Sequence, residues 1–168
     1  MTHPEIVEAA LPPGALLSRY EGPGGYTDCF VATVSGRVTH AAFVEAFYTT
    51  PLFRLERLAL ATFLARPSTD RQARALATGE ADRFAAWTVE ARDADQILLC
   101  DFMSASRSWL MSAVAETSGA TTLFFGTALL PRRRTGRRGI GFRALTPFHR
   151  VYARALLRAA VRRLESGL

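Results

Sequence analysis

The spacing of hydrophobic residues changes about halfway along the chain, from a helical period to a strand period. Residues 26–34 (YTDCFVATV) are rich in β-branched and aromatic side chains and predict a first strand. After it, apolar residues recur three and four positions apart and predict three helices, over residues 39–48, 50–65 and 69–79. The second helix is apolar on nearly all sides, so we expect it to be buried between other elements.

The second half of the chain consists of strand-length apolar runs separated by short turns. These runs predict strands over residues 84–92, 95–103, 107–114, 121–130 and 139–145. Thr146 and Pro147 are a typical helix cap and first helical residue, and they predict a final helix that continues to about Glu165.

Together these elements predict an α+β fold formed by a single domain over residues 1–168. We expect an antiparallel meander of five to six strands, a helical insertion after the first strand, and a long C-terminal helix packed on the sheet. Residues 1–25 contain several prolines and glycines, so we expect this segment to be loosely structured. A sheet crossed by a helix either encloses a pocket for a small apolar ligand or fills its own core.

The net charge of +6 is concentrated in the last third of the chain. From Phe102 to the C-terminus there are twelve arginines and two acids, whereas residues 1–101 contain nine arginines and thirteen acids. All 21 basic residues are arginine, which indicates a codon bias and weakens any inference from arginine content alone. Such a bias does not explain why acids are scarce in the last third.

Arginines gather in a predicted hairpin tip and along the final helix. The tip, RRRTGRR, contains Arg132, Arg133, Arg134, Arg137 and Arg138, and the helix repeats arginine every four residues from Arg150 to Arg162. Either these side chains bind phosphates of a nucleic acid or a membrane surface, or they form a solvated face. The solvated face is favoured, because no nucleic-acid motif is present and no aromatic residues alternate with the loop arginines.

A polar pair is predicted at the turn between two central strands. Asp101 and Arg107 flank Ser104–Ser106, and a three-residue loop would place them opposite each other. Asp101 stands in the apolar run ILLCDFM, where an unpaired carboxylate is costly. The pair either fixes the hairpin register or forms the polar end of a ligand pocket, with companions Asp28, Trp109 and Arg143.

His149 is the most prominent titratable candidate. On a helical projection it shares the apolar face with Tyr152 and Leu156. A histidine facing a pocket can act as a general base near neutral pH, although a core histidine with one hydrogen bond is the commoner case. Three histidines far apart in sequence give no metal signature, and we expect no metal or other cofactor.

The two cysteines, Cys29 and Cys100, are too few and too isolated for a disulfide framework, so we expect both to be reduced. The N-terminus has no basic region followed by a long apolar run, and no stretch approaches 18 apolar residues. A cytoplasmic location is therefore expected.

Three short motifs resemble a bacterial family known as domain of unknown function 2867. They are YTDCF at residues 26–30, Asp101 with SRSW at residues 106–109, and PFHR at residues 147–150. The resemblance implies an α+β domain with a helix-grip outline, in which a sheet and a helix hold a ligand, but it implies no established activity. Family members occur beside NAD-dependent short-chain oxidoreductase domains, which implies such a partner. The chain itself has no GxGxxG fingerprint after its first strand.

The leading hypothesis is a binding module for a small, largely apolar ligand, alone or as a homodimer. Its predicted ligand-binding residues are Asp101, Arg107, Trp109, Arg143, His149 and Tyr152. The first alternative is an enzyme that uses the same pocket for proton transfer, such as a cyclisation or dehydration, with His149 as base. The second is an anion-binding surface formed by the loop arginines and the final helix.

Overall fold

The structure, a computed structural model, describes residues 5–22, 25–130 and 140–167, with side chains from residue 147 onward in the last range. Its centre is a seven-stranded antiparallel sheet with the order β1-β2-β7-β6-β5-β4-β3. The strands are β1 (Val7–Glu8), β2 (Tyr26–Val34), β3 (Arg83–Phe84), β4 (Trp87–Arg92), β5 (Gln96–Asp101), β6 (Ser106–Val114) and β7 (Thr121–Leu129). The strands from β3 to β7 form a meander, and β2 pairs with β7 at its end.

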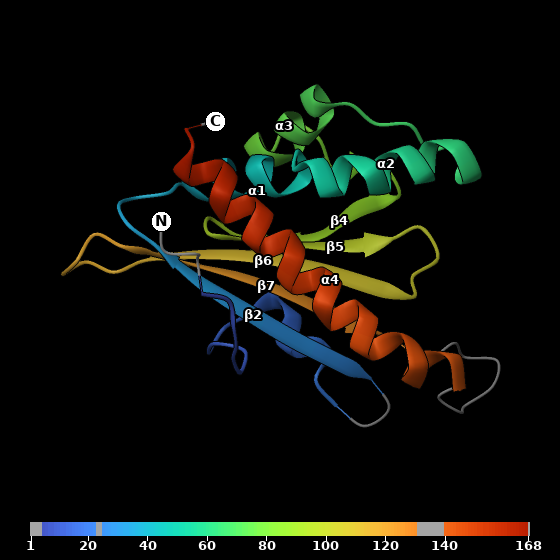
Figure 1. Cartoon of the computed structure of the whole chain (residues 1–168), viewed down its shortest axis with the longest axis horizontal. Coiled ribbons are helices and arrows are strands. Elements are labelled where there is room, and N and C mark those ends of the chain that lie inside the picture. Colours follow the sequence, from blue (N-terminus) through green and yellow to red (C-terminus); the bar gives the residue numbers. More distant parts are fainter. Residues whose placement is uncertain (1–4, 23–24, 131–139, 168) are drawn as a thin grey trace.

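The α-helices cover one face of this sheet. They are α1 (His40–Tyr48), α2 (Pro51–Leu64), α3 (Asp70–Thr78) and α4 (Ile140–Glu165). Figure 1 shows α4 running diagonally across the sheet, with α1, α2 and α3 beside it over the same face. The predicted α+β class, with a helical insertion after the first long strand and a C-terminal helix on the sheet, is confirmed. The strand count is seven rather than five to six.

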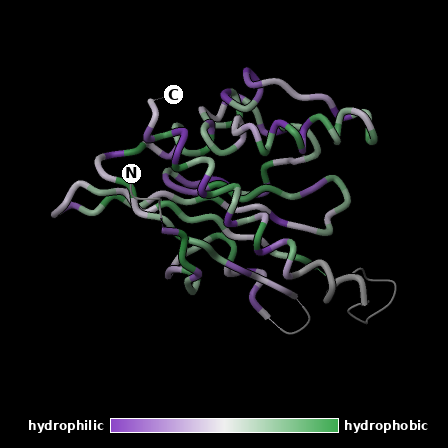
Figure 2. Tube along the Cα trace, viewed as in Figure 1, coloured by the Kyte–Doolittle hydropathy of each residue, from purple (hydrophilic) through white to green (hydrophobic). Residues whose placement is uncertain are grey.

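Two hydrophobic clusters hold the layers together. On the helix face, aromatic side chains from α1 pack against the central strands, with Phe47 and Phe125 having ring centroids 4.6 Å apart. On the other face, Leu17 packs with Trp109 and Leu98, all three with no exposed surface. Figure 2 shows hydrophobic residues along the central strands between the two layers.

Three threonines start the first three helices, as their positions in the sequence predict. Thr39 accepts a hydrogen bond from the amide of Ala42, and Thr50 accepts one from Phe53 with Pro51 at the first helical position. Thr69 forms a capping box with Gln72. In each case the side-chain oxygen satisfies an amide that the helix itself leaves without a partner.

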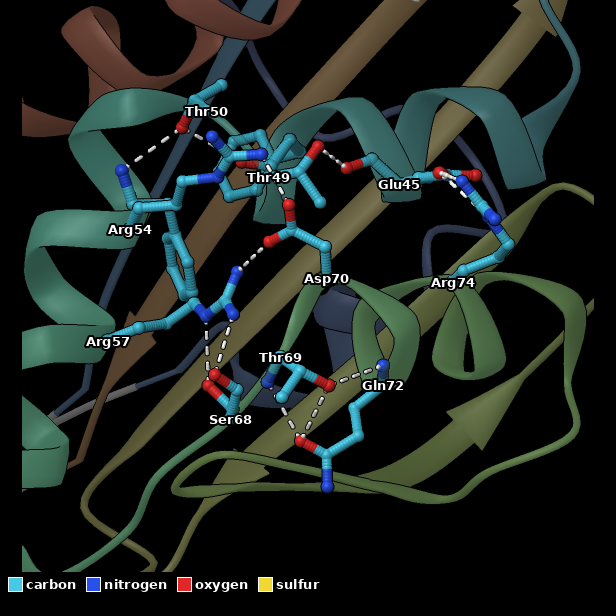
Figure 3. A network of polar contacts seen from close by, with 12 residues as sticks. Glu45, Thr49, Thr50, Arg54, Arg57, Ser68, Thr69, Asp70, Gln72 and Arg74 are labelled. Carbon is cyan, nitrogen blue, oxygen red and sulfur yellow. Dashed lines mark hydrogen bonds and ion pairs between the residues drawn. The ribbon is translucent and has the colours of Figure 1, made fainter.

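Arg57, in the middle of α2, joins this helix to the start of α3 (Figure 3). Its side chain is nearly buried and donates to the Oγ and carbonyl oxygen of Ser68, at 2.9 and 2.7 Å, and to Asp70 at 2.6 Å. Partial burial alone would raise the pKa of Asp70, but the hydrogen bonds from Arg57 and Arg54 hold it below its ordinary value. This network fixes the angle at which the chain leaves α2.

Residues 5–22, the described part of the N-terminal segment before the first long strand, pack on the sheet, which differs from the expectation that residues 1–25 are loosely structured. Within the described part, β1 pairs with β2, and a short 3-10 helix over Leu16–Tyr20 lies on the sheet face opposite the α-helices. Gln96 accepts from the amide of Leu16 at 2.9 Å and donates to the carbonyl of Gly14 at 3.2 Å. The apolar side chains of the segment account for this packing, because the second face of the sheet is also apolar.

Three further expectations need correction. The predicted strand 84–92 is two strands, because Ala85 has φ of 52° and turns the chain between β3 and β4. Residues 140–145 belong to α4 and not to a strand, since a short apolar run does not by itself distinguish the two. Finally, α2 is not buried on all sides: Leu58 and Phe63 are 62% and 82% exposed.

Among the described residues, no helix combines the length and the apolar character needed to cross a membrane.

Candidate functional site

A cavity of about 190 Å³ lies between the helix face of the sheet and helices α1, α2 and α4. Its walls come from five segments distant in sequence, and they combine apolar with polar side chains. The lining residues are Phe47, Phe53, Glu56, Trp87, Ser106, Arg107, Ser108, Phe125, Thr127, Leu129, His149, Tyr152 and Leu156. Since water occupies about 30 Å³ per molecule, the cavity has room for about six waters or a small organic molecule.

Asp28 forms the polar end of this region. Its Oδ1 accepts from the backbone amide of Thr127 at 3.0 Å, and its Oδ2 accepts from the Tyr26 hydroxyl at 3.0 Å. The side chain is only 1% exposed. Because buried carboxylates are costly unless hydrogen-bonded, these two donors explain how Asp28 is accommodated in a strand.

His149 faces Asp28 from α4. Its Nε2 lies 3.4 Å from Asp28 Oδ2, which is ion-pair distance, but this atom makes no hydrogen bond within the described part of the chain. The ring meets Tyr26 edge to face, with centroids 6.3 Å apart. Asp28 and His149 therefore form a carboxylate–imidazole pair at the margin of the cavity.

A second acidic group enters from α2. Glu56 accepts a hydrogen bond from the Tyr152 hydroxyl, which joins α2 to α4. Burial raises the pKa of Glu56, although the hydrogen bond from Tyr152 acts in the opposite direction. Burial and the nearby Glu56 charge also raise the pKa of Tyr152, so its hydroxyl remains a donor at neutral pH.

Three residues that line the cavity each have a buried polar atom with no hydrogen-bond partner among the described residues. These atoms are Trp87 Nε1, Thr127 Oγ1 and His149 Nε2. The others of this kind are the ring nitrogens of His40 and the Nε atoms of three arginines. A buried polar group without a hydrogen-bond partner costs about 1–3 kcal/mol of stability, and three such groups belong to residues around this one cavity.

Asp101 and Arg107 do not pair. The loop spans residues 102–105, one residue longer than expected, and Arg107 is registered against Cys100 instead. Because side chains alternate along a strand, this difference of one residue puts the two on opposite faces. Asp101 accepts from the amide of Ala105 and the hydroxyl of Ser106, at 2.8 and 3.0 Å.

Arg107 borders the cavity, but its guanidinium is engaged elsewhere. It donates to Glu90 and, at 3.0 Å, to the Tyr20 hydroxyl, and it lies 4.8 Å from the centroid of the Tyr20 ring. Trp109 points to the same N-terminal side and donates to Gln96 at 2.9 Å. Both residues therefore anchor the N-terminal segment and do not supply a polar end for the cavity.

Of the remaining predicted site residues, two line the cavity, and the side chains of the others lie outside the described residues. His149 and Tyr152 line the cavity together with Leu156, on the helical face that the sequence predicts. The side chain of Arg143 lies outside the described residues, as do Arg132, Arg133, Arg134, Arg137 and Arg138.

Several polar residues of the cavity carry no strong signal in the sequence. Thr127 and Ser108 are ordinary strand residues, and only the register of the strands brings Thr127 next to Asp28 and Ser108 next to Thr127. Trp87 is equally typical of a strand. A weak signal does exist for Glu56, because it is the only acid between residues 51 and 66, in a helix whose other charged residues are arginines.

A wider depression of about 440 Å³ opens beside the start of α1. His40 lies there with both ring nitrogens buried and without a partner in the described structure. Burial, together with the charge of Arg92, lowers the pKa of His40 to about 4, so it is neutral at pH 7. Among the described residues, no group of three or more His, Cys, Asp or Glu side chains is arranged to hold a metal ion.

The fold and the cavity define an α+β domain in which a sheet and a C-terminal helix enclose a small cavity with a polar end. Comparison of the chain with protein-family models, with curated proteins and with solved structures finds no match. The resemblance to the domain of unknown function 2867 family therefore stays a prediction from three short motifs.

Proposed function

We propose that this protein binds a small molecule in the cavity between the sheet and α4. The observation that carries the proposal is the set of buried atoms without partners at Trp87, Thr127 and His149. One ligand that accepts from Trp87 Nε1 and hydrogen-bonds both to His149 Nε2 and to the Thr127 hydroxyl would satisfy all three atoms. The aromatic and aliphatic walls would hold its apolar part, as in most small-molecule sites.

The charges of the cavity favour a neutral or cationic ligand over an anion. Glu56 lines the cavity, Asp28 lies at its margin in contact with His149, and Arg107, the lining arginine, is already bound to Glu90. An anionic ligand would have to approach these carboxyl groups without a free arginine among the described lining residues to compensate. This differs from a pocket whose polar end is formed by Arg107, as the sequence predicts.

The first test is native mass spectrometry of freshly purified protein, compared with its denatured mass. We expect an additional mass that disappears on denaturation, and we expect Thr127→Val and His149→Gln to lose it. Thr88→Val is the matched control, because Thr88 is exposed and next to Trp87 in sequence.

The same Thr127→Val variant also separates binding from stability. It removes a hydroxyl that has no hydrogen-bond partner among the described residues. We therefore expect the free energy of unfolding of the ligand-free variant to be about 1 kcal/mol higher than that of the ligand-free wild type. If the wild type carries no additional mass, and no compound from a panel of small alcohols, phenols and amines raises its unfolding temperature, the binding proposal is wrong.

Proton-transfer catalysis is the second candidate, and it is favoured by the carboxylate–imidazole pair of Asp28 and His149. A hydrogen-bonded carboxylate beside an imidazole is a common arrangement for a general base. Glu56 lines the same cavity, and its raised pKa suits it to act as the general acid. The test is incubation of the recovered ligand with the protein in D₂O. Deuterium at a carbon of the ligand with wild type, and none with His149→Gln, supports catalysis; an unchanged ligand supports binding alone.

A further inference from the structure

Exposed large hydrophobic side chains gather at one end of the molecule. Eight of the nine in the described structure come from three segments: Leu55, Leu58, Phe63 and Leu64 of α2, Phe102 and Met103 of the β5–β6 loop, and Phe148 and Val151 of α4. We call these eight residues the apolar rim. The ninth, Val7, lies on β1 at the other edge of the sheet.

Contacts join the three segments that carry the rim. Arg66, just after α2, lies 4.5 Å from the centroid of the Phe102 ring, which joins α2 to the β5–β6 loop. Phe148 stacks on Tyr152, with ring planes 4° apart, and Tyr152 binds Glu56 of α2. In Figure 1 the free end of α2, the β5–β6 loop and the first turns of α4 lie at the same, right-hand end of the molecule.

The rim also borders the cavity. Tyr152 lines the cavity on one side and carries Phe148 on the other. Phe148, Val151, Leu58 and Phe63 are each more than 60% exposed, and no part of the described chain covers them. Such a concentration of exposed apolar surface is typical of a site that meets a partner or a membrane.

The charge around the rim is strongly positive. Residues 51–66, 102–106 and 147–154, which carry the rim, contain five arginines and a single acid, Glu56, which is turned inward to Tyr152. Arg54 and Arg57 share Asp70, and Arg150 and Arg154 share Glu8, so each pair retains one uncompensated positive charge. Apolar side chains interspersed with arginines that outnumber the acids paired with them match an anionic lipid surface.

A second copy of the chain fits this surface poorly. In a two-fold dimer the same patch meets itself, so the arginines around one rim would face those of the other. A bilayer containing anionic lipid instead supplies phosphates to the arginines and acyl chains to the apolar residues. We propose that the apolar rim docks the protein peripherally on an anionic membrane, with Phe63, Leu58 and Phe148 inserted at the boundary between headgroups and acyl chains.

The test is co-sedimentation of the full chain with vesicles of phosphatidylcholine and phosphatidylglycerol in a two-to-one ratio, and with phosphatidylcholine alone. We expect binding to the anionic vesicles that weakens without phosphatidylglycerol and at higher salt. We test the double variant Leu58→Gln/Phe63→Gln and, separately, Phe148→Gln. Each should bind the anionic vesicles at least about tenfold more weakly than the wild type, because each change removes an apolar group from the bilayer. Val7→Gln is the matched control and should bind like the wild type.

Several outcomes would overturn the proposal. The first is that the wild type does not bind anionic vesicles at low salt. The second is that the rim variants bind as well as the wild type, and the third is that the Val7→Gln control loses as much binding as the rim variants. A dimer detected by light scattering that the double variant abolishes would assign the rim to a second copy instead. The proposal does not rest on the ligand of the cavity, so either can fail without the other.

Discussion

Gly126 in β7 shows how closely the N-terminal segment packs on the sheet. It is registered against Cys29 on one side and Trp109 on the other. A Cβ at this position would lie 2.7 Å from Leu17 Cδ2 and 2.9 Å from both Trp109 Cε3 and the carbonyl oxygen of Asp28. Only glycine allows Leu17 and Trp109 to meet over this strand.

We therefore expect Gly126→Ala to lower the free energy of unfolding by about 1–3 kcal/mol, because the added methyl group overpacks a fixed contact. Urea denaturation followed by tryptophan fluorescence measures this. Gly22→Ala is the control, since no heavy atom lies within 4 Å of a Cβ there. Equal denaturation midpoints for Gly126→Ala and the wild type would contradict the packing described.

At the scale of elements, α4 has an unusual feature: Pro147 lies within the helix and not at its start. Proline has no N–H, so the hydrogen bond to the carbonyl four residues earlier cannot form. The sequence predicts the opposite arrangement, with Thr146 as cap and Pro147 as first helical residue. Local pattern favours that start, and only the continuation of the chain as a helix from Ile140 displaces it.

The Pro147→Ala variant distinguishes a helix α4 that begins at Ile140 from one that begins after a Thr146 cap. With Pro147 inside α4 we expect the alanine variant to be more stable by about 1–3 kcal/mol, measured by thermal or urea unfolding. Pro51→Ala is the matched control, because Pro51 is the first residue of α2 and its replacement should give no gain. An unchanged or lower stability for Pro147→Ala would place the helix start at Thr146.

Across the whole molecule, the N-terminal segment completes the core on the second face of the sheet. Leu17 has no exposed surface and packs with Trp109, while Gln96 and Arg107 hydrogen-bond to the segment on either side. The sheet is thus sandwiched between the helices and this segment, and the segment stabilises the strands that carry Asp28 and Thr127.

Leu17→Ala should accordingly cost about 2–4 kcal/mol of unfolding free energy, because it leaves a cavity in a fully buried cluster. Leu58→Ala, at a position that is 62% exposed, should change stability by less than about 0.5 kcal/mol. The two variants are compared by urea denaturation. Similar small effects in both would mean that the segment is not part of the core.

The sequence by itself determined those features that depend on neighbours in the chain. Threonine caps start the first three helices, β-branched runs form the long strands, and His149 shares a helical face with Tyr152 because 3.6 residues complete a turn. Tertiary structure decided what depends on register and on contacts between distant segments. A loop one residue longer than expected separates Asp101 from Arg107, and strand pairing brings Asp28, Thr127 and Ser108 to one face. The cavity belongs to this second kind, because its polar atoms come from five segments whose meeting no local pattern encodes.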